Sequence, residues 1–553
     1  MEALWHRNAT VYQVDPSLFK DGDGDGCGDF AGLRSRLDHL RLLGADCLWL
    51  MPFYRSPFRD GGYDIVDHLD VDPRFGDITD FIAMMERAEE LGIRVLIELV
   101  AHHTSDQHPW FQEARSSRDS RFRDYYVWSD EPVETEVESA FPGVEDGVWT
   151  WDEQAQQYYR HVFYSHQPDL NIANPRVREE ILRIMGFWLR LGVCGFRIDA
   201  ASHMMRSAST ADPRDGGLWW LEEMHDYVRQ RSPTAILMGE ADVAVHEYSE
   251  YFEGGHRLTW MLDFWLNNHT FLALAREQAQ PLIDAIDKRS SAPGYCSHLQ
   301  WLRNHDQLDL DQLKPDERED VFAAFAPDPG MRAYKTGIRR RLAPMLGGDA
   351  RRIAMAHSLL FSLPGVPVVR YGEEIGMGED LSRPERLAVR TPMQWSRRCN
   401  GGFSGAAPDA LVVAPVDDPQ YAYPRVNVEA QQGVPGSVLT DTQQFVRTRQ
   451  GMRELIGEAR VVGVDAPSVF GVRYDEGETG SVAVLFTNLS DRPVSFELDA
   501  PDLDPLVDVL SDRPYPEVAG TPLRIELDGY GYRWLRHEEL TLPPGHHGRA
   551  PQR

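Results

Sequence analysis

Cysteine is scarce in this chain, and the few cysteines are not arranged in pairs. Only five occur among 553 residues, and no two of them form a CxxC motif. An odd count at wide spacing argues against a disulfide framework and favours a reducing compartment. We therefore expect a cytoplasmic protein without disulfides. The five are Cys27, Cys47, Cys194, Cys296 and Cys399.

Long apolar runs are also lacking. No segment approaches the roughly 20 apolar residues that a membrane-spanning helix needs. Residues 1–14 show no basic segment followed by an apolar core, which is the pattern of a secretory signal. We expect a soluble protein that does not bind membranes.

Basic residues are outnumbered by acidic ones. The sequence has 57 Lys and Arg against 87 Asp and Glu, a formal net charge of −30. Such a chain repels nucleic-acid phosphates and anionic membranes, so neither is an expected partner. A neutral substrate fits this charge. The length is sufficient for one large domain and a smaller one.

Short apolar segments alternate with amphipathic helical stretches over most of the chain. This alternation predicts parallel β/α units. Eight such units close a barrel, so the predicted fold is an α/β protein with a (β/α)8 TIM barrel. Seven candidate strands are visible, at residues 10–14, 47–51, 94–100, 195–198, 236–239, 298–302 and 366–371.

Two regions interrupt the alternation. Residues 104–168 are rich in Trp, Tyr, His and Asp, and they follow the third candidate strand without forming a β/α unit. We predict an inserted domain there, at the loop face of the barrel. Residues 460–541 contain β-branched strands separated by turns and predict a small antiparallel β domain. The barrel then comprises 1–103 and 169–459, and 542–553 form a flexible tail.

Three carboxylates follow candidate strands. Asp199 follows GFRI, Glu240 follows ILMG, and Asp306 comes shortly after HLQWL. In a β/α barrel these positions meet at the mouth formed by the C-terminal strand ends. Arg197 lies on the same strand face as Asp199 and favours its ionised form, whereas the apolar run before Glu240 favours a raised pKa. The pattern predicts a nucleophile, a general acid/base and a third carboxylate that grips a sugar.

Six motifs in this order resemble family 13 of the glycoside hydrolases, the α-amylase family. They are GGYDI (61–65), ELVAHHTS (98–105), QPDLN (167–171), GFRIDA (195–200), MGEA (238–241) and RNHD (303–306), and the resemblance covers about the first 460 residues. It implies a domain B at 104–168, a C-terminal β domain, and retention through a covalent β-glucosyl intermediate. It also implies that Asp199 is the nucleophile, Glu240 the acid/base and Asp306 the transition-state stabiliser. The implied substrate-binding residues are Asp64, Tyr63, His103, Arg197, His305 and Arg390.

The loop DGDGDGCGD, residues 21–29, alternates oxygen-bearing side chains with glycines. Such a loop can wrap a hard cation such as Ca²⁺. Gly32 occupies the position where an EF-hand has its closing Glu, so the loop is not an EF-hand. The family resemblance implies a structural Ca²⁺ held by Asp21, Asp23, Asp25 and Asp29 and by the carbonyl of Cys27. A solvated acidic turn is the alternative, and no organic cofactor is expected.

The pair His102-His103 raises the question of a zinc site. Neighbouring residues of a strand point to opposite faces, so the two imidazoles cannot easily bind one ion. We therefore do not expect zinc here.

Within the family, the chain looks most similar to trehalose synthases and related α-glucosidases, for example in RTPMQWS (390–396). His102, Gln307 and Arg370 depart from the usual pattern and bear on whether a freed glucose is retained. We therefore expect a retaining hydrolase of short α-glucosides, with trehalose first and maltose also a candidate substrate. A trehalose synthase that isomerises maltose and trehalose is the alternative. An inactive sugar-binding protein is a remote one, because all three carboxylates are present. Oligomeric state, including a homo-oligomer, is left open.

Overall fold

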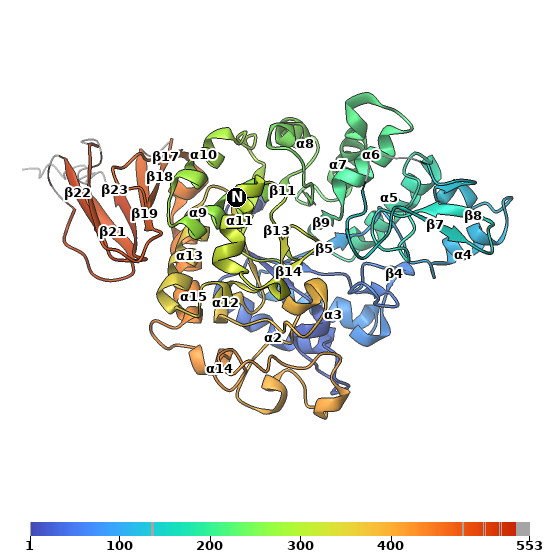
Figure 1. Cartoon of the computed structure of the whole chain (residues 1–553), viewed down its shortest axis with the longest axis horizontal. Helices are drawn as coiled ribbons and strands as arrows, with labels where there is room; N and C mark the ends of the chain where they lie inside the picture. Colours follow the sequence, from blue (N-terminus) through green and yellow to red (C-terminus); the bar gives the residue numbers. More distant parts are fainter. Residues whose placement is uncertain are drawn as a thin grey trace, which may run out of the picture.

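Eight parallel strands close into a barrel at the centre of the molecule (Figure 1). The computed structural model describes residues 2–133, 138–477, 480–500, 503, 505–518, 520 and 522–537. The strand order is β1-β16-β12-β11-β10-β9-β5-β2, so the predicted (β/α)8 barrel is confirmed. The barrel strands are β1 (Val11–Val14), β2 (Cys47–Leu50), β5 (Arg94–Leu99), β9 (Gly195–Ile198), β10 (Ile236–Gly239), β11 (Trp260–Leu262), β12 (Ser297–Trp301) and β16 (Val366–Arg370).

The sequence analysis found seven of these strands and missed β11. This strand has only three residues, and it follows a loop whose α-helix, α8 (Tyr248–Phe252), has only five. The alternation of strand and long helix is therefore lost at this point. Register nevertheless places β11 firmly in the sheet, with Met238 opposite Trp260 and Trp260 opposite Ser297.

Amphipathic helices surround the barrel. In α3, Asp77 caps the first turn through the backbone N–H groups of Thr79 and Asp80, and Phe81 and Met84 lie on the buried face. The burial of such faces fixes the strands from outside. The helices include α2 (Phe30–Leu43), α3 (Ile78–Glu90), α5 (Pro175–Arg190), α6 (Ala201–Ser209), α7 (Trp219–Arg231), α9 (Phe264–Arg276), α13 (Ala350–Ser362) and α15 (Val438–Gly451).

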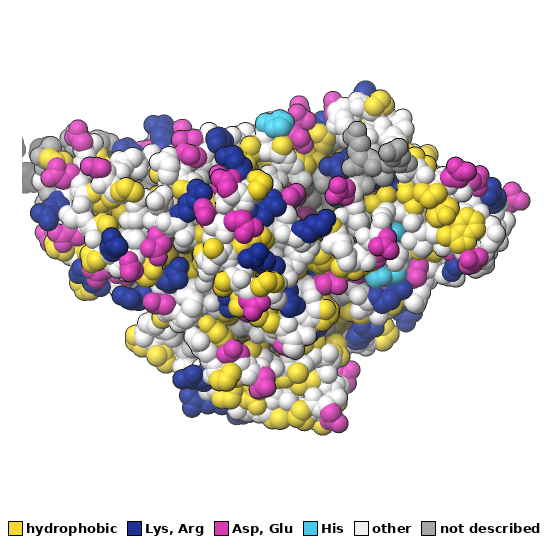
Figure 2. All heavy atoms as spheres, in the orientation of Figure 1, with side chains coloured by type: hydrophobic (Ala, Val, Ile, Leu, Met, Phe, Trp, Pro, Cys, Tyr) yellow, Lys and Arg dark blue, Asp and Glu magenta, His cyan; other side chains and the backbone are white. Residues whose placement is uncertain are grey.

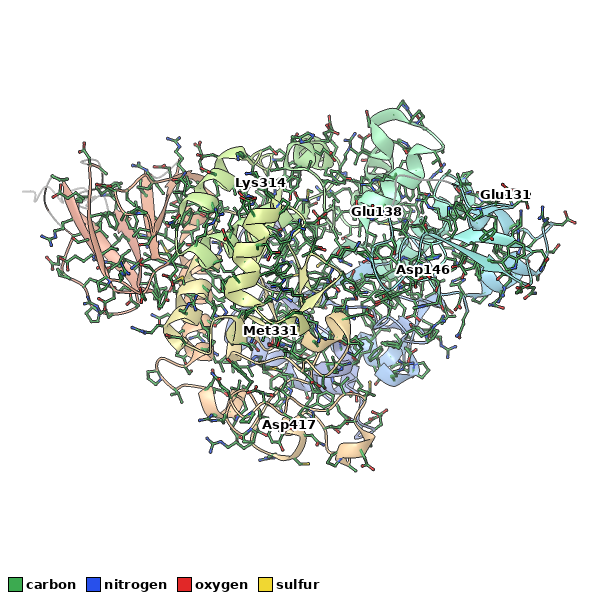
Figure 3. All side chains as sticks on the ribbon, viewed as in Figure 1. Glu131, Glu138, Asp146, Lys314, Met331 and Asp417 are labelled. Carbon is green, nitrogen blue, oxygen red and sulfur yellow. The ribbon has the colours of Figure 1, made fainter. Side chains whose placement is uncertain are left out.

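An excursion after β5 forms the right-hand end of the molecule in Figure 1. It contains α4 (Pro109–Ser116) and a sheet of β6 (Trp128–Ser129), β8 (Gln157–Arg160) and β7 (Trp149–Asp152). Figure 3 places Glu138 and Asp146 of this excursion nearer the barrel than Glu131. The same figure labels Lys314 and Met331, which lie in the segment between β12 and β14 (Arg332–Ala333).

An antiparallel sheet forms the opposite end of the molecule (Figure 1). Its order is β17-β18-β19-β23-β21, and β20 pairs with β22 beside it. Trp534 Nε1 donates to Ser358 Oγ of α13 at 3.0 Å, which fastens this sheet to the barrel. The strands are β17 (Glu458–Val461), β18 (Val469–Glu476), β19 (Ser481–Asn488), β20 (Val494–Leu498), β21 (Leu506–Ser511), β22 (Leu523–Leu527) and β23 (Tyr532–His537). The predicted tail 542–553 lies outside the described residues, and the domain boundaries stay predictions.

The surface carries both charge signs. Figure 2 shows acidic and basic side chains interspersed over the face that it displays. Among the described residues, no helix combines the length and the apolar character needed to cross a membrane.

Candidate active site

Arg197 joins two of the predicted catalytic carboxylates. Its Nη1 donates to Asp199 Oδ1 at 2.5 Å, and its Nη2 lies 2.6 Å from Glu240 Oε1. The two acids follow β9 and β10, which are paired in the barrel with Ile198 opposite Gly239. The carboxylates of Asp199 and Glu240 are thus held beside each other at the barrel mouth, as the two-carboxylate chemistry of a glycosidase requires.

The surroundings of Asp199 and Glu240 shift the pKa of each carboxyl group. Burial raises the pKa of Glu240 to about 7, and the Arg197 charge only partly opposes this. Burial also raises the pKa of Asp199, against the charge of Arg197 and its hydrogen bond. Glu240 can therefore hold a proton near neutral pH, which suits an acid, whereas both the charge and the hydrogen bond of Arg197 favour the ionised form of Asp199, which suits a nucleophile.

Ala200 has a backbone conformation that sequence inspection could not reveal. Its φ of 47° and ψ of 42° lie in the left-handed region, which is unfavourable for alanine. In this conformation, its N–H donates to Glu240 Oε2 at 2.9 Å. The strained residue after the predicted nucleophile thus positions the predicted acid.

Asp306, the third carboxylate, is held by two arginines and a histidine. Its Oδ1 accepts from Arg386 Nη1 at 2.8 Å and from Arg390 Nη2 at 3.0 Å. Its Oδ2 lies 3.0 Å from His305 Nε2. Burial alone would raise the pKa of Asp306, but His305 and the two arginines outweigh it and hold the pKa well below its usual range. This group stays ionised and suits a hydrogen-bond acceptor for sugar hydroxyls.

His305 is fixed by its neighbours. Gln13 Nε2 contacts His305 Nδ1 at 2.8 Å, and because an amide nitrogen only donates, the imidazole proton lies on Nε2. Nε2 faces Asp306 and also lies 2.9 Å from the Tyr63 hydroxyl. The Tyr63 ring stacks on His305 at 5.7 Å. The predicted residues Tyr63, His305 and Asp306 therefore form one connected cluster.

Glu98 supports this cluster from inside the barrel. Its Oε1 accepts from Trp49 Nε1 at 2.8 Å and from the Tyr63 hydroxyl at 3.2 Å, and its Oε2 accepts from Arg197 Nη1 at 2.7 Å. The sequence analysis assigned no role to this residue, although it opens the motif ELVAHHTS. It gives Arg197 a third carboxylate partner.

Asp64 and its neighbour Asp60 have different partners in the structure. Asp64 is fully buried, and its oxygens accept from Ser56 Oγ at 2.9 Å and from the backbone N–H of Arg59 at 3.1 Å. Its sugar contact stays a prediction. Asp60, which was not singled out, accepts from Arg386 Nη2 at 2.5 Å. Since Arg386 also binds Asp306, Asp60 belongs to the connected cluster.

His103 has a free ring nitrogen. Its Nε2 contacts the carbonyl of Tyr63 at 3.2 Å, while its buried Nδ1 has no hydrogen-bond partner in the part of the chain that the structure describes. A buried polar atom without a partner is costly unless a ligand satisfies it. The predicted sugar-binding role of His103 fits this observation.

Five side chains from three segments form a roof beside Asp306. We use "roof" for Phe141, Tyr164, Tyr334, Glu385 and Arg386. The hydroxyls of Tyr164 and Tyr334 both donate to Glu385 Oε2, at 2.6 and 2.5 Å. Arg386 lies 4.9 Å from the Phe141 ring centre, and Phe141 stacks on Tyr164 at 4.2 Å. The roof connects the excursion after β5 to the loop after β16 and reaches Asp306 through Arg386.

The three departures from the family pattern lie near these residues. Arg370 donates from Nη1 to the carbonyl of Asn304 at 2.9 Å and from Nη2 to that of Val389 at 2.7 Å. His102 Nδ1 lies 3.5 Å from Asp169. Gln307 follows Asp306 directly, and Gln307 Oε1 has no hydrogen-bond partner among the described residues. Arg370 thus ties the segments that carry Asp306 and Arg390 together.

The predicted cation loop gathers three of its carboxylates. Oxygens of Asp21, Asp23 and Asp29 lie within 4.8 Å of one another. The loop turns at Gly24 and Gly26, whose φ values of 88° and 99° suit glycine. An all-oxygen donor set of this kind fits Ca²⁺. Asp25 and Cys27 are not part of the gathered set, and their ligand roles stay predictions.

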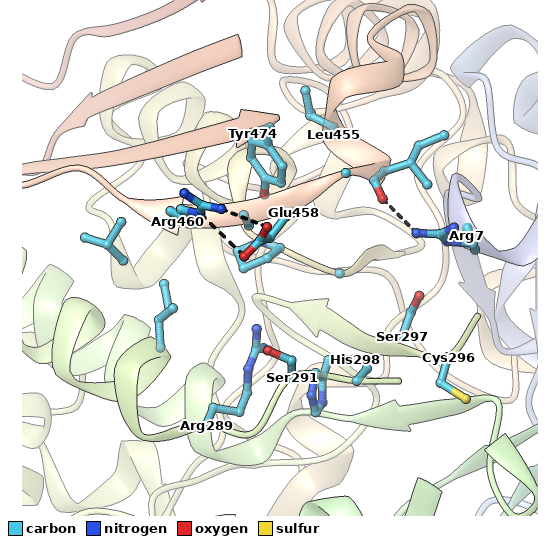
Figure 4. A pocket seen from close by; sticks show the side chains of 18 of the residues that line it. Arg7, Arg289, Ser291, Cys296, Ser297, His298, Leu455, Glu458, Arg460 and Tyr474 are labelled. Atoms are coloured by element: carbon cyan, nitrogen blue, oxygen red, sulfur yellow. Dashed lines mark hydrogen bonds and ion pairs between the residues drawn. The ribbon is translucent and has the colours of Figure 1, made fainter. Parts of the chain in front are cut away.

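A second hollow, of about 840 Å³, lies at the opposite end of the barrel, where β12 begins and β17 passes (Figure 4). Arg7 and Arg460, which line this hollow, already bind other groups of the protein. Arg7 donates to the carbonyl of Ile456 at 2.8 Å, and Arg460 pairs with Glu458 at 2.9 Å. Catalytic groups of β/α barrels lie at the C-terminal strand ends, so this hollow is not the candidate site.

Comparison with known proteins agrees with the geometry. The α-amylase catalytic-domain family matches residues 13–311 and 339–457. The trehalose synthase/amylase TreS of Mycobacterium tuberculosis is 39% identical, over 98% of this chain and 92% of its own. The trehalose synthase of Pimelobacter sp. is 38% identical, over 98% and 97%.

Solved structures give the same result. The α-amylase of H. orenii superposes with a TM-score of 0.78 at 25% identity and covers 96% of this chain and 99% of its own. The trehalulose synthase MutB gives 0.76 at 26% identity, over 96% and 100%. The predicted relationship is confirmed: the chain belongs to the α-amylase family of enzymes, which act on α-glucosidic bonds.

Proposed function

We propose that the protein interconverts trehalose and maltose by transferring an α-glucosyl group within a closed pocket. The observation that carries this proposal is the roof. Interconversion requires that the freed glucose stay beside the glucosyl-enzyme while water is kept out. The contacts of Tyr164 and Tyr334 with Glu385, and of Arg386 with Asp306, join the excursion after β5 to the loop after β16 next to the third carboxylate. The similarity to proteins named trehalose synthase supports the same reaction.

The reaction uses two displacements at the anomeric carbon. Asp199 Oδ attacks that carbon, and Glu240 gives its proton to the glycosidic oxygen, so that glucose leaves and a β-glucosyl ester forms. A hydroxyl of the retained glucose then attacks the anomeric carbon and gives its proton to Glu240, while the bond between that carbon and Asp199 Oδ breaks and Asp199 leaves as the carboxylate. Attack by the 4-hydroxyl gives maltose, and attack by the anomeric hydroxyl gives trehalose. Two inversions restore the α configuration.

Arg197, Asp306 and His305 assist without changing covalently. Arg197 holds Asp199 and Glu240 in position, as its contacts of 2.5 and 2.6 Å indicate. Asp306, kept ionised, accepts hydrogen bonds from ring hydroxyls, which strengthen as the ring distorts toward the transition state. Arg390 and Arg386 orient the Asp306 carboxylate.

Hydrolysis of trehalose is the competing outcome, favoured by the departures at His102, Gln307 and Arg370. The same ester then reacts with water.

We also propose that Asp21, Asp23 and Asp29 hold a structural Ca²⁺, because their oxygens converge at the start of α2. This ion would hold the loop of residues 21–29 in place and would take no part in bond cleavage.

Product analysis distinguishes the two outcomes. Purified protein is incubated with trehalose and, separately, with maltose, and the sugars are separated by chromatography at several times. We expect each disaccharide to appear from the other faster than glucose accumulates, and Asp199→Asn to form neither product. Glucose as the only product from both substrates would reject interconversion in favour of hydrolysis.

A further inference from the structure

A cavity of about 470 Å³ lies between the excursion after β5 and helix α6. We call it the arginine pocket, because Arg118, Arg123 and Arg160 line it together with Asn171, Ser207 and Thr210. A single carboxylate, Asp124, is among the lining residues. In a chain with a net charge of −30, three arginines around one small cavity form an unusual concentration of positive charge.

Arg123 and Arg118 form one side of the arginine pocket. Arg123 is buried, stacks 3.8 Å from the Trp128 ring centre and donates to the carbonyl of Ala114 at 2.8 Å. Burial, together with the neighbouring charge of Arg118, lowers the pKa of Arg123. Arg118 contacts Asp130 at 2.9 Å, but both side chains are more than half exposed, so this pair contributes little. Asp124, Asp130 and Asp152 act on Arg123 in the opposite sense, so the two positive charges are partly compensated.

Arg160 forms the other side. Its Nε lies 3.4 Å from Asp169 Oδ2 and makes no hydrogen bond to any described residue. Burial raises the pKa of Asp169 to about 7, so this counter-charge is itself weak near neutral pH. A planar guanidinium with unused donors binds phosphate oxygens in a bidentate manner.

We propose that the arginine pocket binds a hexose monophosphate, with the phosphate on Arg118, Arg123 and Arg160 and the sugar hydroxyls toward Asn171, Ser207 and Thr210. Asn171 and Thr210 already donate to backbone carbonyls, and Ser207 Oγ accepts from the backbone N–H of Ile172, so the groups left for sugar hydroxyls are the Asn171 and Thr210 oxygens as acceptors and the Ser207 hydroxyl as a donor. The cavity is large enough for one such molecule. This inference does not rest on the trehalose–maltose reaction.

The arginine pocket is connected to the active site. Asp169, the neighbour of Arg160, also lies 3.5 Å from His102 Nδ1. His102 precedes His103 at the barrel mouth. A phosphate that draws Arg160 away from Asp169 therefore changes the charge next to the catalytic strand end, and occupancy is expected to change the rate of the main reaction.

Isothermal titration calorimetry with glucose 6-phosphate tests the proposal, with inorganic phosphate as the comparison ligand. Titrations are repeated in saturating trehalose, which fills the catalytic pocket. We expect one molecule per chain, unaffected by trehalose, and at least tenfold weaker binding in both Arg118→Gln and Arg160→Gln. Arg121→Gln is the matched control, because Arg121 is an exposed arginine of the same segment that does not line the pocket.

Three results would overturn the assignment. The first is the absence of saturable binding at up to about 10 mM ligand. The second is binding that trehalose abolishes and that the two variants leave intact, which would place the ligand in the catalytic pocket. The third is equal affinity for inorganic phosphate, which would remove the sugar from the proposal. Arg118 is exposed, so Arg118→Gln is informative even where Arg160→Gln lowers stability.

Discussion

Two groups of buried charges in the barrel are arranged differently. At the mouth, Arg197 is shared by Glu98, Asp199 and Glu240, so that one cation serves three carboxylates. Directly after β11, the buried Asp263 pairs with Arg289, and among the described residues neither has a second ion-pair partner. A one-to-one pair fixes both charges, whereas a shared cation lets protonation change as a substrate enters. The difference separates charges that hold the fold from charges that carry chemistry.

Removing a shared charge at the mouth is expected to have the largest effect. Asp199→Asn keeps the shape of the side chain but cannot form the glucosyl ester. We expect kcat to fall by about 10⁴-fold or more, with an unchanged melting temperature. Activity within tenfold of the parent would show that Asp199 is not the nucleophile.

Breaking the matched pair of Arg289 and Asp263 is expected to act on stability alone. Arg289→Met leaves Asp263 buried without its cation, although Gln300 Nε2 still donates to it at 3.0 Å. We expect a loss of about 3 kcal/mol in the free energy of unfolding, measured by urea denaturation, and unchanged kcat in the folded fraction. A variant as stable as the parent but slower would reverse the distinction between the matched pair and the shared cation.

Weakening the roof is expected to change products more than rate. Glu385→Gln removes the charge that accepts from Tyr164 and Tyr334 but keeps an oxygen in place. We expect the ratio of glucose to transferred disaccharide to rise severalfold at nearly constant total turnover. An unchanged ratio would show that the roof does not retain the freed glucose. Glu429→Gln, an exposed glutamate far from Asp306 along the chain, is a control for the loss of one charge.

A chelator tests the proposed ion site, where the carboxylates of Asp21, Asp23 and Asp29 gather. A chelator is expected to lower the melting temperature by a few degrees, which corresponds to about 1–2 kcal/mol, without altering kcat below the transition. Asp21→Asn should melt at the chelated temperature and be insensitive to chelator. Identical melting curves with and without chelator would count against the ion.

The pH dependence of kcat/KM is expected to show a smaller, graded effect. Glu240 must hold its proton to act as an acid, so activity is present below its pKa and lost above it. Because burial raises that pKa to about 7, kcat/KM should decline as the pH rises through neutrality. A plateau extending to about pH 9 would assign the proton to another group.

The sequence predicted that Asp199 and Glu240 lie at neighbouring strand ends, because the ends of buried parallel strands can be recognised in it. Asp199 and Glu240 each follow an apolar segment directly, and the parallel pairing of β9 and β10 brings them together. Asp60 and Arg386 were missed because they belong to loops, where no periodic pattern relates the place of a residue in the sequence to the direction of its side chain. One signal for Asp60 was available, because this residue directly precedes the motif GGYDI. No feature of the amino-acid sequence indicates the left-handed conformation of Ala200.

The fold was predicted more completely than the site. Barrel strands such as β9 and β10 coincide with their predicted ranges, because a buried parallel strand is a short apolar run. The exception, β11, is too short for that signal. The roof depends on contacts between segments that are more than 160 residues apart in the sequence, such as the contact of Tyr164 with Tyr334. No local sequence pattern specifies such a contact.

The covalent step at Asp199 is tested most directly by trapping the intermediate. In Glu240→Gln, α-glucosyl fluoride can still form the ester, since fluoride leaves without an acid, but the ester loses the base that activates its acceptor. Mass spectrometry of the quenched and digested protein should then find one anhydroglucose on the peptide that contains Asp199. An adduct on another residue, or turnover of the fluoride with inverted product and no adduct, would contradict the account.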